Sequence, residues 1–181
     1  MNSYIQVILI YMVILILSPK RYLSILPTIP IYPNNYEESL IVQEISENRT
    51  MSDILFFKKT DEKVSPAFEP YVNETIEELD KIFLDFTIHY SILFYKYTIN
   101  RARPYQINPK IKILKSETGN TPSFPAGHAM QAYYLAKYLS EKYPSKRTLL
   151  FTIAKKCDEC RIKAGIHYPS DGHYSRYLLN L

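Results

Sequence analysis

The stretch Ser123-Phe124-Pro125-Ala126-Gly127-His128 combines a helix-start signal with a glycine and a histidine. Proline is tolerated in the first turn of a helix, so the stretch predicts that a helix begins at Pro125 or Ala126. The unpaired N–H groups and the dipole at such a helix start attract an anion. Gly127 has no Cβ, so an oxygen atom can approach the backbone closely. The stretch therefore indicates an anion site at a helix N-terminus.

The totals describe one ordinary folded domain. The chain has 181 residues, of which 46% are apolar and 22% are charged, a composition typical of globular proteins. A net charge of +4, without a basic stripe interleaved with aromatic residues, argues against a nucleic-acid partner. Cys157 and Cys160 have the spacing of a redox pair or half a zinc site, but no second pair of soft ligands accompanies them. We expect two ordinary thiols and no bound metal.

The N-terminal part of the chain predicts a hydrophobic segment followed by a connector. Tyr4–Leu17 is an uncharged apolar run of about 14 residues, shorter than the roughly 20 of a membrane helix. Residues 1–21 are predicted to be an uncleaved membrane anchor or a signal segment, with a buried or partner-packing helix as the third alternative. The protein is then either membrane-associated through this segment or exported. Prolines at three-residue spacing predict that residues 22–35 form an extended connector before the folded domain, 36–181.

Helical signals fill the folded domain. The strongest has a capping box at Thr75–Glu78 and apolar residues at three- and four-residue spacing. Pro104 disfavours helix at Arg103, so we expect this helix to end there. A second turn is expected to be capped by Ser52, and Gly165 to terminate a later helix. The expected helices are 37–46, a turn after Ser52, 73–102, 125 or 126 to about 143, 145–163, and a last one from 170 or 171, with a long loop over 105–121.

The polar residues around these helices suit phosphate chemistry. A phosphate monoester needs fixed donors around its oxygens, a nucleophile in line with the ester bond, and an acid. Lys96, Arg103 and Arg161 are cations, and arginine can bind two oxygens at once. Asp171 can hold one ring nitrogen of His167, so that the other nitrogen attacks phosphorus.

His128 completes the set as the acid that protonates the leaving oxygen and later takes a proton from water. One imidazole must be neutral while the other is charged, so we expect an acidic or bell-shaped pH profile.

The motifs Lys96-x6-Arg103-Pro104, Pro125-Ala126-Gly127-His128 and Arg161-x5-His167-x3-Asp171 together resemble the signature of the type 2 phosphatidic acid phosphatase (PAP2) superfamily. This superfamily includes bacterial non-specific acid phosphatases, lipid phosphatases and vanadium haloperoxidases, and the resemblance spans roughly residues 50 to 175. It implies an all-α, single-domain helical bundle and a metal-independent phosphatase without a cofactor. It further implies His167 as the nucleophile that forms phosphohistidine, His128 as the acid and base, Asp171 as the residue that orients His167, and Lys96, Arg103, Gly127 and Arg161 as phosphate ligands.

The chain departs from the family pattern at three places. Ala126 stands where serine is usual, which removes a hydrogen bond to phosphate of about 1–3 kcal/mol. Cys160 replaces a serine often found before the third-motif arginine. The sequence ends ten residues after Asp171, so we expect a short last helix that leaves one side open or completed by a partner such as a second copy.

Alternatives to the phosphatase follow from the same residues. Vanadate in the same pocket gives a haloperoxidase in related proteins, and Ala126 is compatible with a degenerate, non-catalytic phosphate binder attached to a membrane. The substrate alternatives are soluble phosphate esters and lipid phosphates. His89 lies on roughly the same helical face as Lys96 and can line the pocket, but we expect an interior or surface histidine without a role there.

Overall fold

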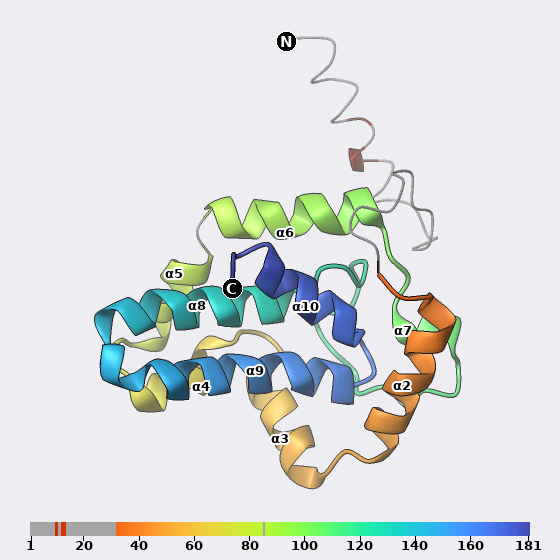
Figure 1. Ribbon diagram of the computed structural model, residues 1–181, viewed down its shortest axis with the longest axis horizontal. Helices are drawn as coiled ribbons and strands as arrows, with labels where there is room; N and C mark the ends of the chain where they lie inside the picture. Colours follow the sequence, from red (N-terminus) through yellow and green to blue (C-terminus); the bar gives the residue numbers. More distant parts are fainter. Residues whose placement is uncertain (1–9, 11, 14–31, 85) are drawn as a thin grey trace.

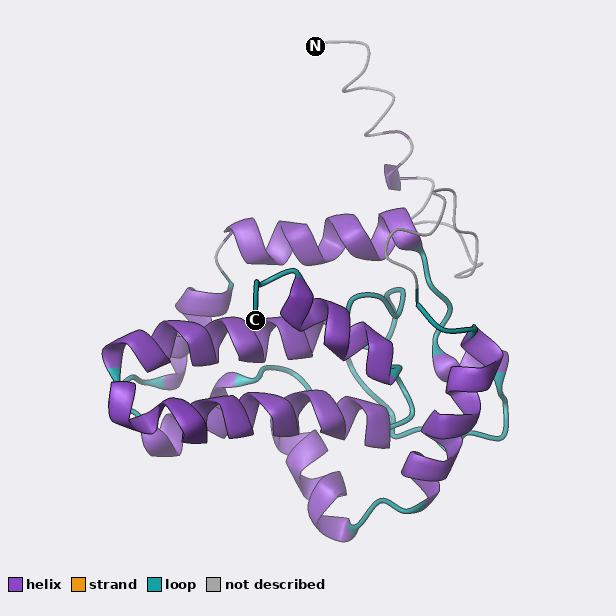
Figure 2. Ribbon diagram, viewed as in Figure 1, coloured by secondary structure: helices purple, strands orange, loops and turns teal. Residues whose placement is uncertain are grey.

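The computed structural model describes residues 10, 12–13, 32–84 and 86–181. Every regular element in this part of the chain is a helix, so the predicted all-α fold is confirmed (Figure 2). The elements are α2 (Asn35–Glu47), α3 (Met51–Thr60), α4 (Ser65–Phe68), the 3-10 turn η1 (Glu69–Tyr71), α5 (Ile76–Phe83), α6 (Phe86–Ile99), α7 (Pro104–Ile107), α8 (Gly127–Lys142), the 3-10 turn η2 (Pro144–Lys146), α9 (Arg147–Lys163) and α10 (Pro169–Tyr177).

The centre of the bundle is the antiparallel pair α8 and α9, joined by η2 (Figure 1). Helix α10 packs against both, α6 and α5 pack on α8, and α2 and α3 pack on α9. Fully buried Leu135, Leu139 and Leu150 lie in the main apolar cluster between these helices. The flanking helices therefore all pack on the α8–α9 pair, and the loop that precedes α8 lies among them.

Local capping explains where the first helices begin. The side chain of Asn34 accepts hydrogen bonds from the first turn of α2, and the predicted capping box of Thr75 and Glu78 opens α5. The predicted cap at Ser52 is wrong, because Thr50 caps α3 two residues earlier through a box with Asp53. That box satisfies the free N–H groups of the first turn.

The expected single helix over 73–102 is two helices, α5 and α6. The apolar stripe that runs through Leu79 and Phe83 is buried in α5, but Tyr90, further along that stripe, is 53% exposed. Helix α6 instead buries Ile88 and Ile92, so a different face packs on the core after the break. The three- and four-residue spacing continued across the break, and it therefore predicted one helix where tertiary packing uses two faces.

The segment before Arg103 also differs from its prediction. Helix α6 ends at Ile99, and Asn100 adopts a left-handed φ of 50°, a conformation that asparagine tolerates after a helix. Arg103 is extended, as expected for a residue before proline, and it precedes α7, which occupies the start of the predicted 105–121 loop. Arg103 therefore lies on a connection between two helices rather than at the end of α6.

The later boundaries agree closely with the sequence. Helix α8 begins at Gly127, α9 ends at Lys163, and Gly165 follows it with a left-handed φ of 76°. A Cβ at Gly165 would lie 2.6 Å from Ile111, so this turn requires glycine for both its backbone and its packing. Cys157 and Cys160 are free and buried, in agreement with two ordinary thiols.

Most of the predicted anchor and most of the predicted connector lie outside the described residues. None of the helices in the described part of the chain has the length and apolar character needed to cross a bilayer. The boundaries at residues 21 and 35 stay predictions.

Candidate active site

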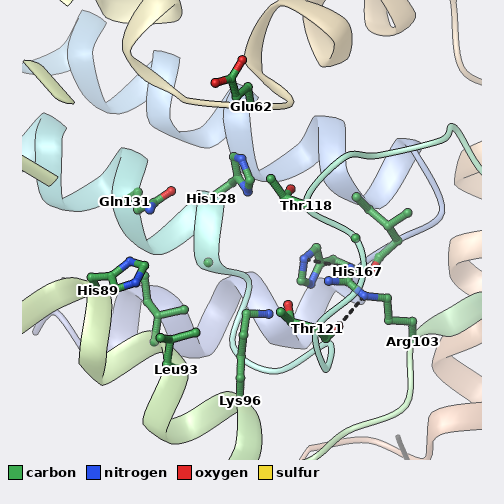
Figure 3. A pocket seen from close by; sticks show the side chains of 14 residues that line it. Glu62, His89, Leu93, Lys96, Arg103, Thr118, Thr121, His128, Gln131 and His167 are labelled. Carbon is green, nitrogen blue, oxygen red and sulfur yellow. Dashed lines mark hydrogen bonds between the residues drawn. The ribbon is translucent and has the colours of Figure 1, made fainter. Parts of the chain in front are cut away.

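A cavity of about 180 Å³ lies where α6, the N-terminus of α8 and the two loops before α8 and α10 meet (Figure 3). It brings together five of the predicted site residues from separate parts of the chain: Lys96, Arg103, Gly127, His128 and His167. The remaining lining residues are Glu62, His89, Ile92, Leu93, Thr118, Gly119, Thr121, Gln131 and Ile166. The other two predicted residues, Asp171 and Arg161, lie behind the wall of this cavity.

Asp171 holds the ring of His167 from behind. The Nδ1 atom of His167 lies 3.2 Å from Oδ2 of Asp171. Both side chains are buried. The carboxylate also accepts hydrogen bonds from Arg101 Nη1 (2.6 Å), Ser123 Oγ and the backbone N–H of Tyr168 (3.0 Å). Although burial by itself raises the pKa of Asp171, the charge of Arg101 and the hydrogen bond from His167 hold it well below its ordinary value. An ionised Asp171 accepts the proton of Nδ1, which fixes the tautomer of His167.

The other ring nitrogen of His167 faces the cavity. Its Nε2 atom lies 3.3 Å from Nη1 of Arg103, which donates to an unprotonated ring nitrogen. Burial, and then the charge of Arg103, lower the pKa of His167 to about 3. The imidazole is therefore neutral at physiological pH, with a lone pair on the nitrogen that faces the cavity.

Backbone carbonyl groups aim the two cations at this nitrogen. Arg103 donates from Nε to the carbonyl of Thr121 (2.8 Å) and from Nη1 to the carbonyl of Ile166 (2.7 Å). Lys96 donates to the carbonyl of Pro122, and its Nζ points toward the middle of the cavity in Figure 3. Burial and the charge of Arg103 lower the pKa of Lys96 well below its ordinary value. Two positively charged groups at this end of the cavity favour an anion between them.

Gly127 opens α8 against α6. A Cβ on Gly127 would lie 3.3 Å from Ile92 and 3.6 Å from Cε of Lys96, so glycine allows α6 to approach the helix start. Ala126 is fully buried and has no side-chain hydrogen bond to cap α8. The N-terminal amides of α8 are thereby left to solvent or an anion.

His128 lies in the first turn of α8. Its Nε2 atom is buried and has no hydrogen-bond partner among the described residues. Burial, and then the charge of Arg161, lower the pKa of His128 well below its ordinary value. This imidazole is therefore neutral at physiological pH, and a bound anion would raise its pKa.

Arg161 does not line the cavity. It is fully buried, and it donates to Asp61 Oδ1 (2.9 Å), to Thr60 Oγ1 (2.9 Å) and to the carbonyl of Thr60. Its Nε atom is buried without a hydrogen-bond partner in the described part of the chain. The Nη1 and Nη2 atoms of Arg161, a predicted phosphate ligand, thus already donate to Asp61 and Thr60, whereas its Nε has no acceptor in the described part of the chain.

Sequence reasoning missed the residue that organises this site from behind, Arg101. It forms ion pairs with Asp171 (2.6 Å) and Glu38 (2.8 Å) and is 1% exposed. Its guanidinium group stacks on the ring of Tyr168, 3.8 Å from the centroid. No local signal identifies Arg101, because Glu38 is 63 residues away and the arginine was assigned to a helix body. His89, for which the sequence indicated a place in the pocket as the less favoured alternative, lines the cavity.

The site thus combines a neutral, oriented histidine with two basic side chains and a helix N-terminus, an arrangement suited to an anion such as phosphate. The family model of the PAP2 superfamily matches residues 82–178. The chain therefore belongs to the PAP2 superfamily, whose proteins generally hydrolyse phosphate esters. A comparison with curated proteins found no match. Glu38, Thr60 and Asp61 precede the matched segment, so the first helices of the domain contribute to the surroundings of the site.

Proposed function

We propose that this protein hydrolyses phosphate monoesters without a metal, through a phosphohistidine intermediate on His167. The observation that carries the proposal is the position of His167, whose Nδ1 is held by Asp171 while Nε2 lies beside Arg103 in the cavity. A nucleophile needs an unshared electron pair aimed at the reacting atom, and this arrangement supplies it.

In the first step, Nε2 of His167 forms a bond to phosphorus while the bond from phosphorus to the alcohol oxygen breaks. His128 gives a proton to that oxygen, and the alcohol leaves. Lys96, Arg103 and the N-terminal amides of α8 stabilise the charge on the equatorial oxygens. A bound dianion also raises the pKa of His128, so that it carries the proton it must donate.

In the second step, a water molecule attacks phosphorus and His128 accepts a proton from it. The bond between phosphorus and Nε2 breaks, inorganic phosphate leaves, and the neutral form of His167 is restored. Since His128 must be protonated in one step and neutral in the next, we expect a bell-shaped or acidic pH profile.

Hydrolysis of a chromogenic phosphate by the full-length chain tests this proposal. We expect turnover that resists EDTA and is inhibited by vanadate. The variant His167→Ala should lose turnover entirely, and His128→Asn should lose about 10²–10⁴-fold in kcat. The matched control is His173→Ala, because His173 is an exposed histidine on α10 outside the cavity. Undiminished turnover in His167→Ala, or turnover that EDTA abolishes, would contradict the mechanism.

Ala126 supports one second candidate, a phosphate binder without turnover. Its methyl group cannot supply the hydrogen bond that the usual serine gives, and the residue is fully buried. Calorimetric binding of phosphate with no hydrolysis of any ester would favour this candidate. Gain of hydrolysis in Ala126→Ser would then assign the loss to the missing hydroxyl group.

We also propose that the N-terminal run Tyr4–Leu17 attaches the protein to a membrane or directs its export. Selection between soluble and lipid esters depends on the part of the pocket that contacts the alcohol, not on the part that binds the phosphate group.

A further inference from the structure

Several polar residues line the cavity without a part in the proposed phosphate chemistry, and three of them have long or ring side chains. They are Glu62, from the turn after α3, His89, from α6, and Gln131, from α8. We name this group the outer rim. Glu62 and His89 are exposed and Gln131 is partly buried, so the group lies where the cavity opens to solvent.

The position of His128 relates the outer rim to the reaction. His128 protonates the oxygen of the leaving alcohol, so the alcohol must lie beside His128 and away from the phosphate ligands. In Figure 3, Glu62, Gln131 and His89 lie around His128 on the side away from Arg103 and His167. The outer rim therefore lies where the alcohol part of a bound ester would extend.

The two ends of the cavity differ in charge. Lys96 and Arg103 are at the phosphate end, whereas the outer rim carries the carboxylate of Glu62. Glu62 forms no salt bridge with another described residue. A carboxylate attracts an ammonium group or a hydroxyl donor and repels a second anion, while His89 and Gln131 can hydrogen-bond polar atoms. An ester with phosphate at one end and a donor at the other matches this pattern.

The size of the cavity limits the alcohol. Pockets for drug-sized ligands have volumes of roughly 300–1,000 Å³, and this cavity has about 180 Å³. It has room for a phosphate group and a few further atoms. A small alcohol fits these dimensions better than an alcohol with long apolar chains.

We propose that Glu62, His89 and Gln131 form a subsite for the leaving group, which selects phosphate monoesters of small alcohols that carry an ammonium group or hydroxyl donors. The subsite disfavours alcohols with a second negative charge or a purely apolar end. This inference rests on the proposed function, because it uses His128 to place the alcohol.

Three esters of similar size separate the possibilities. O-Phosphoethanolamine ends in an ammonium group, propyl phosphate in a methyl group and phosphoglycolate in a carboxylate. For the full-length protein we expect kcat/KM to fall in that order. Glu62→Gln should reduce the preference for O-phosphoethanolamine over propyl phosphate by a factor of about 1.5 to 5, the range for an exposed charge pair. Glu141→Gln, an exposed acid on α8 outside the cavity, should leave the preference unchanged.

Binding separates this inference from the proposed function. Dissociation constants of the same esters for His167→Ala, measured by calorimetry, do not depend on turnover. The subsite would be supported if the affinities of His167→Ala for the three esters fall in the same order, and if adding Glu62→Gln reduces the preference for O-phosphoethanolamine. This result would hold even if the wild-type protein hydrolysed none of the esters. Equal affinities for the three esters, tighter binding of propyl phosphate, or an unchanged preference in Glu62→Gln would overturn it.

Discussion

Two buried carboxylates lie on different sides of α10. Asp171 belongs to α10 itself and Asp158 to the neighbouring helix α9, and their surroundings are opposite. Asp171, within α10, is fully buried and accepts hydrogen bonds from Arg101, Ser123 and His167 among other donors. Asp158, on α9, is 5% exposed and packs against Gly172, where a Cβ would lie 2.1 Å from its Oδ1. That oxygen has no hydrogen-bond partner among the described residues.

This comparison shows that hydrogen-bond and ion-pair partners, rather than burial alone, set the charge of the two carboxyl groups. Burial raises the pKa of both carboxyls, but Arg101 and His167 hold that of Asp171 well below its ordinary value. Burial raises the pKa of Asp158 to about 7, against the opposing charge of Arg176, and the charge of Asp171 adds to the rise. The side of α10 that faces the site is built for a permanent anion, and the side that faces α9 is not.

Removing Arg101 should have the largest effect on stability. Arg101→Leu leaves Asp171 and Glu38 as buried carboxylates without their cation, and breaking a buried pair in this way costs about 3–5 kcal/mol. Urea unfolding at neutral pH measures the free energy of unfolding. Arg147→Leu is the matched control, because Arg147 is exposed and its loss should stay below about 1 kcal/mol. A loss of similar size in both variants would contradict the central role of Arg101.

Asp158→Asn should have the next largest effect, and the effect should depend on pH. The folded protein keeps a proton on Asp158 up to about pH 7, whereas the unfolded chain releases it near its ordinary pKa of 3.8. Stability due to this group is therefore present at low pH and falls as pH rises from about 4 to 7. Since one pKa unit corresponds to about 1.4 kcal/mol, a rise from 3.8 to about 7 means that the wild type should lose on the order of 4 kcal/mol relative to Asp158→Asn across this range.

Urea unfolding of both proteins between pH 4 and pH 8 checks this difference. The difference between them isolates Asp158 from His167, whose lowered pKa makes stability fall in the opposite direction, as pH drops below about 6.5. A difference that does not vary with pH would show that Asp158 is not a buried, protonated acid.

Ser123→Ala should have the smallest effect of the three. It removes one of the donors to Asp171, while Arg101 and the N–H of Tyr168 still hold the carboxylate. We expect a loss of about 1 kcal/mol in the free energy of unfolding and a modest decrease in kcat. A loss as large as that of Arg101→Leu would mean that the hydroxyl group, not the guanidinium, holds Asp171.

Sequence spacing predicted the parts of the site that lie on local structure. His167 and Asp171 are four residues apart around the start of α10, and Gly127 and His128 open α8, so their positions follow from helix boundaries. The helix break after Phe83 was missed because apolar spacing does not reveal which face packs on the core. Such choices depend on tertiary contacts.

Charge pairs between distant segments could not be predicted from the sequence. Arg101 joins Glu38 of α2 to Asp171 of α10, and Arg161 is held by Asp61 and Thr60 from the end of α3. Both arginines are too far in sequence from their carboxylates for any local pattern to connect them. The motif therefore identified Arg161 by its type and position but not by its contacts.

Capture of the phosphorylated enzyme would test the phosphohistidine mechanism directly. The full-length protein is mixed with a phosphate monoester, quenched within milliseconds in alkali, where phosphohistidine survives, and measured by intact mass and peptide mapping. We expect one added phosphoryl group on His167 in the wild type and none in His167→Ala. Steady turnover with no phosphoryl group on the protein, or with the group on another residue, would contradict it.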